Sequence, residues 1–237
     1  MAHKSASAPD PSAAVSPVFR LKVCGMKYAD NIAAVAGLEP DFMGFIFHSG
    51  SSRFVGEELD ARLLQRLPAS LCKVGVFVDE SLEFITRQVT RYGLNLAQLH
   101  GHETPAQCAA LQAAGIPVMK AFAVDEAFSL ARLDPYVAHC AYFLFDTKGP
   151  QPGGNGTAFN WNLLRDYHLP VPYLLAGGLG LENAWQLLQL DLPGLYGFDL
   201  NSRFETAPAV KAVVRLRQMF RFLRRYTTID STEKMAG

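Results

Sequence analysis

The feature that most constrains this fold is a regular alternation between short apolar runs and longer amphipathic stretches. Apolar runs of this length are typical of strands buried on both faces of a parallel sheet. Eight such runs are present, at 20–24, 42–47, 73–78, 96–100, 117–124, 141–146, 173–177 and 195–200. Amphipathic helix patterns follow them at 29–38, 56–67, 81–93, 104–115, 125–134, 160–166, 180–190 and 207–226.

Eight consecutive strand-then-helix units predict an α/β fold, a single closed parallel (βα)8 TIM barrel. An open doubly wound sheet with two subdomains is the alternative, but it would usually show a long linker or a break in composition. The chain has 237 residues, of which 49% are hydrophobic, enough for one such barrel. We expect a flexible leader at 1–18, rich in Ala, Ser and Pro, the catalytic barrel at 19–226, and a C-terminal tail at 227–237.

The overall charge and the cysteines exclude several classes of protein. Lys plus Arg number 22 and Asp plus Glu number 22, so no net field attracts nucleic acid or an anionic membrane surface. No run approaches the roughly 18 apolar residues of a membrane span, and the first residues lack a secretory signal. We therefore expect a cytoplasmic protein with a small-molecule partner, as a monomer or a homodimer. Four scattered cysteines without zinc-ligand spacing predict free thiols and no structural metal.

Reactive and polar residues collect where the predicted strands end, and (βα)8 barrels build their active sites at the carboxyl ends of strands. Cys24 is the one cysteine at such an end, because Cys72 and Cys140 lie at or before strand starts and Cys108 lies in a helix pattern. A small buried hydrophobe is the ordinary interpretation of a free cysteine. The other strand ends favour a reactive one, since they carry Arg53, His100, Asp146, Gly177, Gly178, Asp199 and Ser202. A thiol, an acid, an arginine and a glycine turn on one rim predict chemistry on an anionic ligand.

A series of short motifs runs in one order from about residue 20 to residue 225. They are "KVCG" (22–25), "GFIFHSGSSRFV" (44–55), "VGVFV" (74–78), "QLHGHE" (98–103), "KAF" (120–122), Asp146 with "GGNGTAFNW" (153–161), "LAGGL" (175–179) and the segment from Asp199 to Lys211. Together they resemble the phosphoribosylanthranilate isomerase family of tryptophan biosynthesis. Three positions depart from the family pattern: Ser52 replaces a usual proline, Arg203 replaces a frequent glycine, and the 153–161 loop lacks the lysine of "GGTGKTFDW".

The resemblance implies an isomerase that converts N-(5-phosphoribosyl)anthranilate into 1-(2-carboxyphenylamino)-1-deoxyribulose 5-phosphate by an Amadori rearrangement, with no cofactor. This reaction needs an acid to protonate the furanose oxygen and a base to remove the C2′ proton. By resemblance, Cys24 is the general base and Asp146 the general acid. The resemblance and the residue chemistry suggest three sets of binding residues: Arg53 for the anthranilate carboxylate, His100 and Asp199 for the anthranilate side, and Gly177, Gly178 and Ser202 for the phosphate.

Both catalytic roles place demands on pKa values. A free thiol titrates near about 8.5, so Cys24 needs a cation or backbone N–H groups nearby to form thiolate. Lys22, two residues earlier on the same face of its strand, is the candidate cation. Asp146 must instead stay protonated, which requires its pKa to rise above about 3.9, and the preceding "YFLF" makes burial the expected cause.

Structural interpretations stay open beside the functional ones. The alternatives are a helix N-cap for Asp146, a salt bridge to Glu57 for Arg53, internal hydrogen bonds for His100 and Asp199, an ordinary turn for the glycine pair, and a solvated position for Arg203. Two rival functions also stay open. The related isomerase of histidine biosynthesis is disfavoured because its family ends strand 1 in aspartate, and a binding-only barrel is disfavoured because it needs neither Cys24 nor Asp146.

Overall fold

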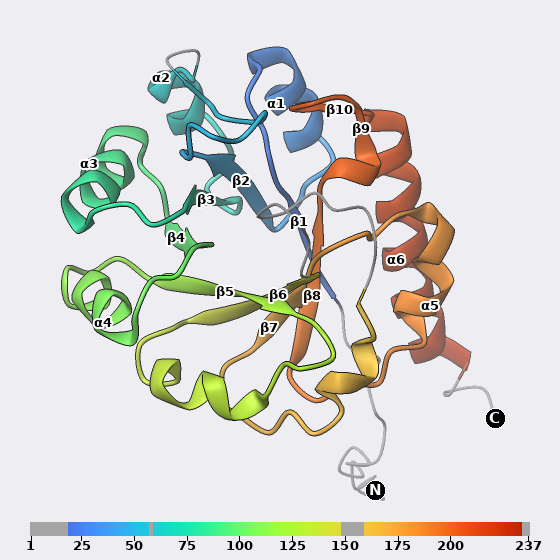
Figure 1. Ribbon diagram of the computed structural model, residues 1–237. Helices are drawn as coiled ribbons and strands as arrows, with labels where there is room; N and C mark the ends of the chain where they lie inside the picture. Colours follow the sequence, from blue (N-terminus) through green and yellow to red (C-terminus); the bar gives the residue numbers. More distant parts are fainter. Residues whose placement is uncertain (1–18, 57–58, 148–158, 234–237) are drawn as a thin grey trace, which may run out of the picture.

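The computed structural model describes residues 19–56, 59–147 and 159–233, with side chains up to residue 224. Its centre is a closed barrel of eight parallel strands that pair in chain order, with the last strand closing on the first (Figure 1). The strands are β1 (Arg20–Val23), β2 (Phe42–Ile46), β3 (Cys72–Phe77), β4 (Leu96–Leu99), β5 (Val118–Val124), β6 (Tyr142–Thr147), β7 (Tyr173–Leu175) and β8 (Leu195–Leu200). The predicted (βα)8 barrel is confirmed.

The two faces of each strand pack against different layers, because successive side chains point to opposite sides of the sheet. One cluster fills the barrel interior, with Phe42, Val74, Leu96, Met119, Ala121, Leu144, Leu174 and Ala176 among its members. A much larger cluster lies between the strands and the helices, and includes Val23, Phe45, Phe145 and Phe198. Both faces are thus apolar, which explains why the strands read as continuous hydrophobic runs.

Helices cover the outside of the barrel (Figure 1). The α-helices are α1 (Ala29–Ala36), α2 (Ala61–Gln65), α3 (Leu82–Tyr92), α4 (Pro105–Ala113), α5 (Ala184–Leu188) and α6 (Val213–Glu233). None of the helices in the described ranges combines the length and the apolar character needed to cross a lipid bilayer.

Local signals set several of these helix ends. Thr104 caps α4 by accepting a hydrogen bond from Gln107 N, while the Gln107 side chain bonds back to Thr104 N at 2.7 Å. Pro105 begins that helix, where its missing N–H has no partner to lose. Gly93 ends α3 in the left-handed conformation, with φ of 58°.

The segments after β5 and β6 differ from the predicted α-helices. After β5, residues 125–134 were expected to be helical, but the chain forms a 3₁₀ helix, η1 (Leu130–Tyr136). Asp125 accepts a hydrogen bond from Ala127 N, which favours a turn, and Pro135 has no N–H to extend a helix. After β6, the short predicted helix at 160–166 is a four-residue 3₁₀ helix, η2 (Trp161–Leu164).

The chain after β7 and β8 is also more elaborate than predicted. A 3₁₀ turn, η3 (Leu181–Asn183), precedes α5, and another, η4 (Ser202–Phe204), follows β8. An antiparallel pair, β9 (Glu205–Ala207) and β10 (Val210–Lys211), then occupies the start of the helix predicted at 207–226. Helix α6 therefore begins only at Val213, and its backbone continues to Glu233, past residue 227, where the tail was expected to begin.

Candidate active site

All eight predicted site residues line one pocket at the carboxyl ends of the barrel strands. They are Cys24, Arg53, His100, Asp146, Gly177, Gly178, Asp199 and Ser202. The remaining lining residues are Ile46, His48, Ser51, Val76, Val78, Gln98, Ala176, Leu179, Asn201 and Arg203. The closed barrel brings these residues together from segments up to 179 positions apart in the chain.

The Cys24 thiol lies at the end of β1, next to a glycine of β2. The residue is 4% exposed, and its backbone N–H donates to Leu200 O of β8 at 3.0 Å. A Cβ atom on Gly44 would lie only 2.7 Å from Cys24 Sγ. Because Gly44 has no side chain, the sulfur of Cys24 has room beside β2.

An ion pair lies one side-chain position below the thiol. Lys22 Nζ on β1 donates to Asp199 Oδ2 on β8 at 2.6 Å, and Lys22 is fully buried. Burial alone would lower the pKa of Lys22, yet the neighbouring Asp199 carboxylate raises it, so the lysine keeps its charge. Among the described residues, no group hydrogen-bonds to the other oxygen of Asp199, Oδ1, although it is buried.

Burial raises the pKa of the Cys24 thiol above its usual value. Lys22 acts in the predicted direction and lowers that pKa, as does Lys211, but the loss of solvation outweighs both cations and Asp199 adds to the rise. Because Lys22 is paired with Asp199, its charge is only partly available to a thiolate. The free protein therefore holds Cys24 as a neutral thiol at pH 7.

Asp146 lies near the end of β6, close to the turn that follows β7. Its Oδ1 accepts a hydrogen bond from Thr147 N at 2.8 Å, and the residue is 7% exposed. Gly177 has φ of 82°, and a Cβ there would come within 2.7 Å of Asp146 Oδ1. A larger residue at 177 would be strained and would displace the carboxylate.

His100 connects Asp146 to a residue that the sequence analysis did not single out, Gln98. His100 Nε2 lies 3.4 Å from Asp146 Oδ2, and His100 Nδ1 lies 2.8 Å from Gln98 Nε2. Gln98 and His100 are two residues apart on β4 and its extension, so both side chains face the barrel interior. That period-two spacing within "QLH" is the signal that would have identified Gln98.

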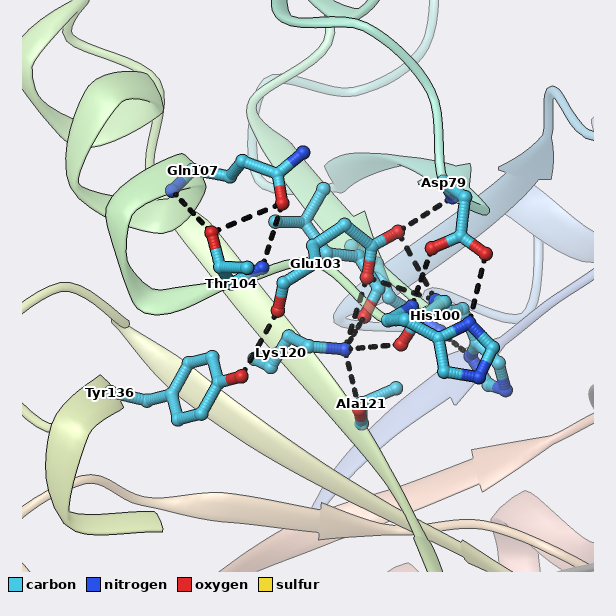
Figure 2. A network of polar contacts seen from close by, with 12 residues as sticks. Asp79, His100, Glu103, Thr104, Gln107, Lys120, Ala121 and Tyr136 are labelled. Carbon is cyan, nitrogen blue, oxygen red and sulfur yellow. Dashed lines mark hydrogen bonds and ion pairs between the residues drawn. The ribbon is translucent and has the colours of Figure 1, made fainter. Parts of the chain in front are cut away.

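A buried polar network fixes the chain on both sides of His100 (Figure 2). Lys120 Nζ on β5 donates to the carbonyl oxygens of Leu99 and Gly101 at 3.2 and 2.8 Å, and pairs with Glu103 Oε2 at 3.0 Å. Glu103 also accepts the backbone N–H groups of Gly101 and Asp79. These contacts hold the β4 loop against β3 and β5, so the His100 backbone has little freedom to move.

Arg53 lines the pocket, but its guanidinium is already engaged. Nε and Nη2 donate to Glu205 of β9, with distances of 2.9 Å to Oε1 and 2.7 Å to Oε2. Lys211 Nζ donates to the same carboxylate at 2.6 Å. The partner anticipated from the sequence, Glu57, lies outside the described residues. Glu205, which the sequence analysis did not assign to the site, therefore orients Arg53 across 152 positions of the chain.

The turns after β7 and β8 form the remaining side of the pocket. Gly177 and Gly178 both have positive φ, 82° and 64°, a conformation that glycine adopts readily. Asn183 Nδ2 donates to Gly178 O, and Asn183 Oδ1 accepts from Gly180 N. The side chain of Asn183, at the end of η3, therefore stabilises the turn that follows β7. Ser202 begins η4 on the neighbouring loop, and the exposed Arg203 also lines the pocket. The lysine-lacking loop lies mostly in 148–158, outside the described residues.

This chain is similar in sequence to proteins of one family. Residues 21–221 match the family described as N-(5'-phosphoribosyl)anthranilate (PRA) isomerase. The isomerase of Phocaeicola vulgatus is 44% identical over 191 residues, covering 81% of this chain and 91% of that protein, and that of Parabacteroides distasonis is 38% identical, covering 83% and 90%.

Solved structures extend the similarity to three dimensions. The isomerase of Thermotoga maritima superposes with a TM-score of 0.77 at 30% identity, covering 88% of this chain and 99% of that one. A phosphoribosyl anthranilate isomerase in complex with reduced 1-(o-carboxyphenylamino)-1-deoxyribulose 5-phosphate superposes with a TM-score of 0.74 at 28% identity, covering 87% and 99%. The match across the barrel, in sequence and in structure, shows that this chain belongs to the N-(5'-phosphoribosyl)anthranilate isomerase family.

Proposed function

We infer that this protein is the tryptophan-pathway isomerase that converts N-(5-phosphoribosyl)anthranilate into 1-(2-carboxyphenylamino)-1-deoxyribulose 5-phosphate. The observation that carries this inference is that Cys24 and Asp146 line the same pocket from β1 and β6, three strands apart around the barrel. An aldose–ketose rearrangement needs one group to give a proton and another to take one. A thiol and a carboxyl group facing one pocket meet that need.

In the proposed mechanism, Asp146 is the general acid and protonates the furanose oxygen, which opens the ring to an iminium. Cys24 is the general base and removes the proton from C2′, giving the enolamine that becomes the ketose. Because the thiol is neutral in the free protein, only the small thiolate fraction is competent. Lys22 and Lys211 favour that fraction through their charges.

Substrate binding is assigned to the rest of the rim. Arg53, oriented by Glu205, faces the anthranilate carboxylate, and His100 and Asp199 lie on the anthranilate side. Gly177, Gly178 and Ser202 present backbone and hydroxyl groups to the phosphate. Two buried acceptors lack hydrogen-bond partners within the described ranges, Asp199 Oδ1 and Gln98 Oε1, and both residues line the pocket. Hydroxyl and N–H groups of the substrate would satisfy them.

We also propose that the protein acts in the cytoplasm on a small-molecule substrate. A small phosphorylated sugar substrate and a charge-balanced chain fit a cytoplasmic enzyme that acts on neither nucleic acid nor membrane. The isomerase of Thermotoga maritima is dimeric, and monomers generated from it have been solved as well. Monomer and homodimer are both compatible with the pocket, because one chain supplies all eight proposed residues.

The direct test is an anthranilate-fluorescence assay with purified protein and freshly prepared phosphoribosylanthranilate. Wild type should consume the substrate, and Cys24→Ala should lose most of the activity while still binding a product analogue. Activity should persist in the presence of a chelator, because no step uses a metal. A wild-type protein that binds the analogue without turnover would point to the binding-only barrel instead.

A further inference from the structure

Three polar side chains form a chain of contacts across the inside of the barrel. Gln98 Nε2 lies 2.8 Å from His100 Nδ1, and His100 Nε2 lies 3.4 Å from Asp146 Oδ2. The first two residues belong to β4 and its extension, and the third to β6, with β5 between them. The acid proposed for the reaction is thus connected, through an imidazole, to a buried amide.

The geometry selects one tautomer of His100. A neutral imidazole carries its proton on one ring nitrogen and accepts a hydrogen bond at the other. In the orientation that the Gln98 amide has in this structure, its nitrogen faces Nδ1 and can only donate, which makes Nδ1 the accepting nitrogen and places the proton on Nε2. That proton is then on the ring nitrogen nearest to Asp146, 3.4 Å from its Oδ2.

Gln98 is held beside His100 by its place in the sheet. The residue is 1% exposed, and it lies between Val76 of β3 and Met119 of β5 in the sheet register. The His100 backbone is held by the network of Lys120 and Glu103 (Figure 2). In this orientation Gln98 Oε1 has no hydrogen-bond partner among the described residues, and Gln98 lines the pocket.

We propose that Gln98 is a positioning residue that keeps the imidazole proton of His100 on Nε2, where it faces Asp146. The catalytic effect of this tautomer rests on the proposed function, in which Asp146 is the general acid. When Asp146 gives its proton to the furanose oxygen, a carboxylate forms in a buried site. The Nε2–H group of His100 then stabilises that carboxylate, which favours proton donation at the moment the ring opens.

The first test observes the tautomer directly in the ligand-free protein, by ¹⁵N-edited NMR of the imidazole rings. His100→Asn identifies the His100 signals by their loss. Wild type should show a protonated Nε2 and an unprotonated Nδ1. A proton found on Nδ1 alone would overturn the proposal, and this result would not depend on whether the protein is an isomerase.

Two variants change the partner of Nδ1. Gln98→Met keeps the length of the side chain but removes the donor, so the tautomers should mix. Gln98→Glu offers only acceptors, so Nδ1 should become protonated. Gln88→Met is the matched control, since Gln88 is a buried glutamine of α3 that does not line the pocket. Its imidazole spectrum should match that of wild type.

The kinetic arm separates positioning from binding. In Gln98→Met and Gln98→Glu, kcat should fall about 10- to 100-fold, because the partner of the acid loses its orientation. KM should change little in Gln98→Glu, which keeps an acceptor oxygen toward the substrate, and should rise in Gln98→Met, which does not. Unchanged kcat together with an unchanged tautomer in both variants would refute the role. If Gln98→Met does not fold, Gln98→Glu and the wild-type spectrum decide the question. A protonated Nε2 in a wild-type protein without isomerase activity would instead refute the proposed function.

Discussion

Lys22 of β1 and Asp199 of β8 form a buried ion pair, with 2.6 Å between Nζ and Oδ2, at the seam where the last strand closes on the first. The pair lies directly below Cys24 on the same face of β1. It therefore does two things at once. It links the first strand of the barrel to the last, and it places a cation and an anion next to the thiol proposed as the base.

Removing one member of this pair should destabilise the protein. Lys22→Met leaves the Asp199 carboxylate buried without its partner, so the free energy of unfolding should fall by about 3–5 kcal/mol. The double variant Lys22→Met/Asp199→Leu should recover most of that loss, because no buried charge is left. Urea unfolding followed by circular dichroism measures both. A single variant as stable as wild type would contradict the interpretation of the pair as a coupled unit.

The raised pKa of Cys24 predicts a late onset of thiol reactivity. Only the thiolate is alkylated, so the rate of Cys24 modification by iodoacetamide should still be rising well above the pH of about 8.5 at which a free thiol titrates. Mass spectrometry of the Cys24 peptide gives the rate, with a free small-molecule thiol as the reference. In Lys22→Met the rise should move to still higher pH, because a lowering influence is lost. A plateau at about pH 8 would mean that the cations outweigh burial.

Gly44→Ala tests the space that the sulfur occupies. The new methyl group would lie 2.7 Å from Cys24 Sγ, so the thiol must shift. We expect kcat to fall about 100-fold, since a displacement of about 1 Å at a reacting group has that effect. Gly37→Ala is the control, because a methyl group there meets only helix carbonyl oxygen at 3.5 Å and should leave kcat unchanged. Equal activity in the two variants would show that Cys24 does not need its observed position.

Asp146→Asn separates proton donation from structure. The asparagine side-chain oxygen can still accept the Thr147 N–H bond, so the fold should persist, but the proton is gone. We expect kcat to fall by about 10²- to 10⁴-fold in the fluorescence assay. Asp166→Asn, at an exposed carboxyl outside the pocket, should behave as wild type. Turnover near the wild-type rate in Asp146→Asn would remove Asp146 from the acid role.

Arg53→Ala should raise KM about 10-fold and lower kcat as well, because Arg53 is proposed both to bind and to orient the anthranilate ring. Glu205→Gln should produce a weaker version of the same change, since it loosens the Arg53 fork without removing it. Arg20→Ala is the matched control, as Arg20 pairs with Asp41 and does not line the pocket. Steady-state kinetics measures all three, and an unchanged KM in Arg53→Ala would place Arg53 outside the binding site.

The positions of the strand-end residues could be predicted from the sequence for a simple reason. Parallel strands of a closed barrel present their carboxyl ends on one rim, so once the alternation is recognised, Cys24, His100, Asp146 and Asp199 must lie near one another. The helices were less predictable. Asp125 and Pro135 favour turns through local hydrogen bonding and a missing N–H, and these effects override an amphipathic pattern.

What the sequence by itself determined is the order of elements and the residue types on the rim, because periodicity and strand ends are local properties of the chain. Tertiary structure alone decided the pairing of those residues. Arg53 is paired with Glu205, and Lys22 with Asp199, because barrel closure sets distances between segments more than 150 positions apart. The state of Cys24 follows from the same closure, since burial depends on every strand around the thiol and outweighs the lysine two residues away.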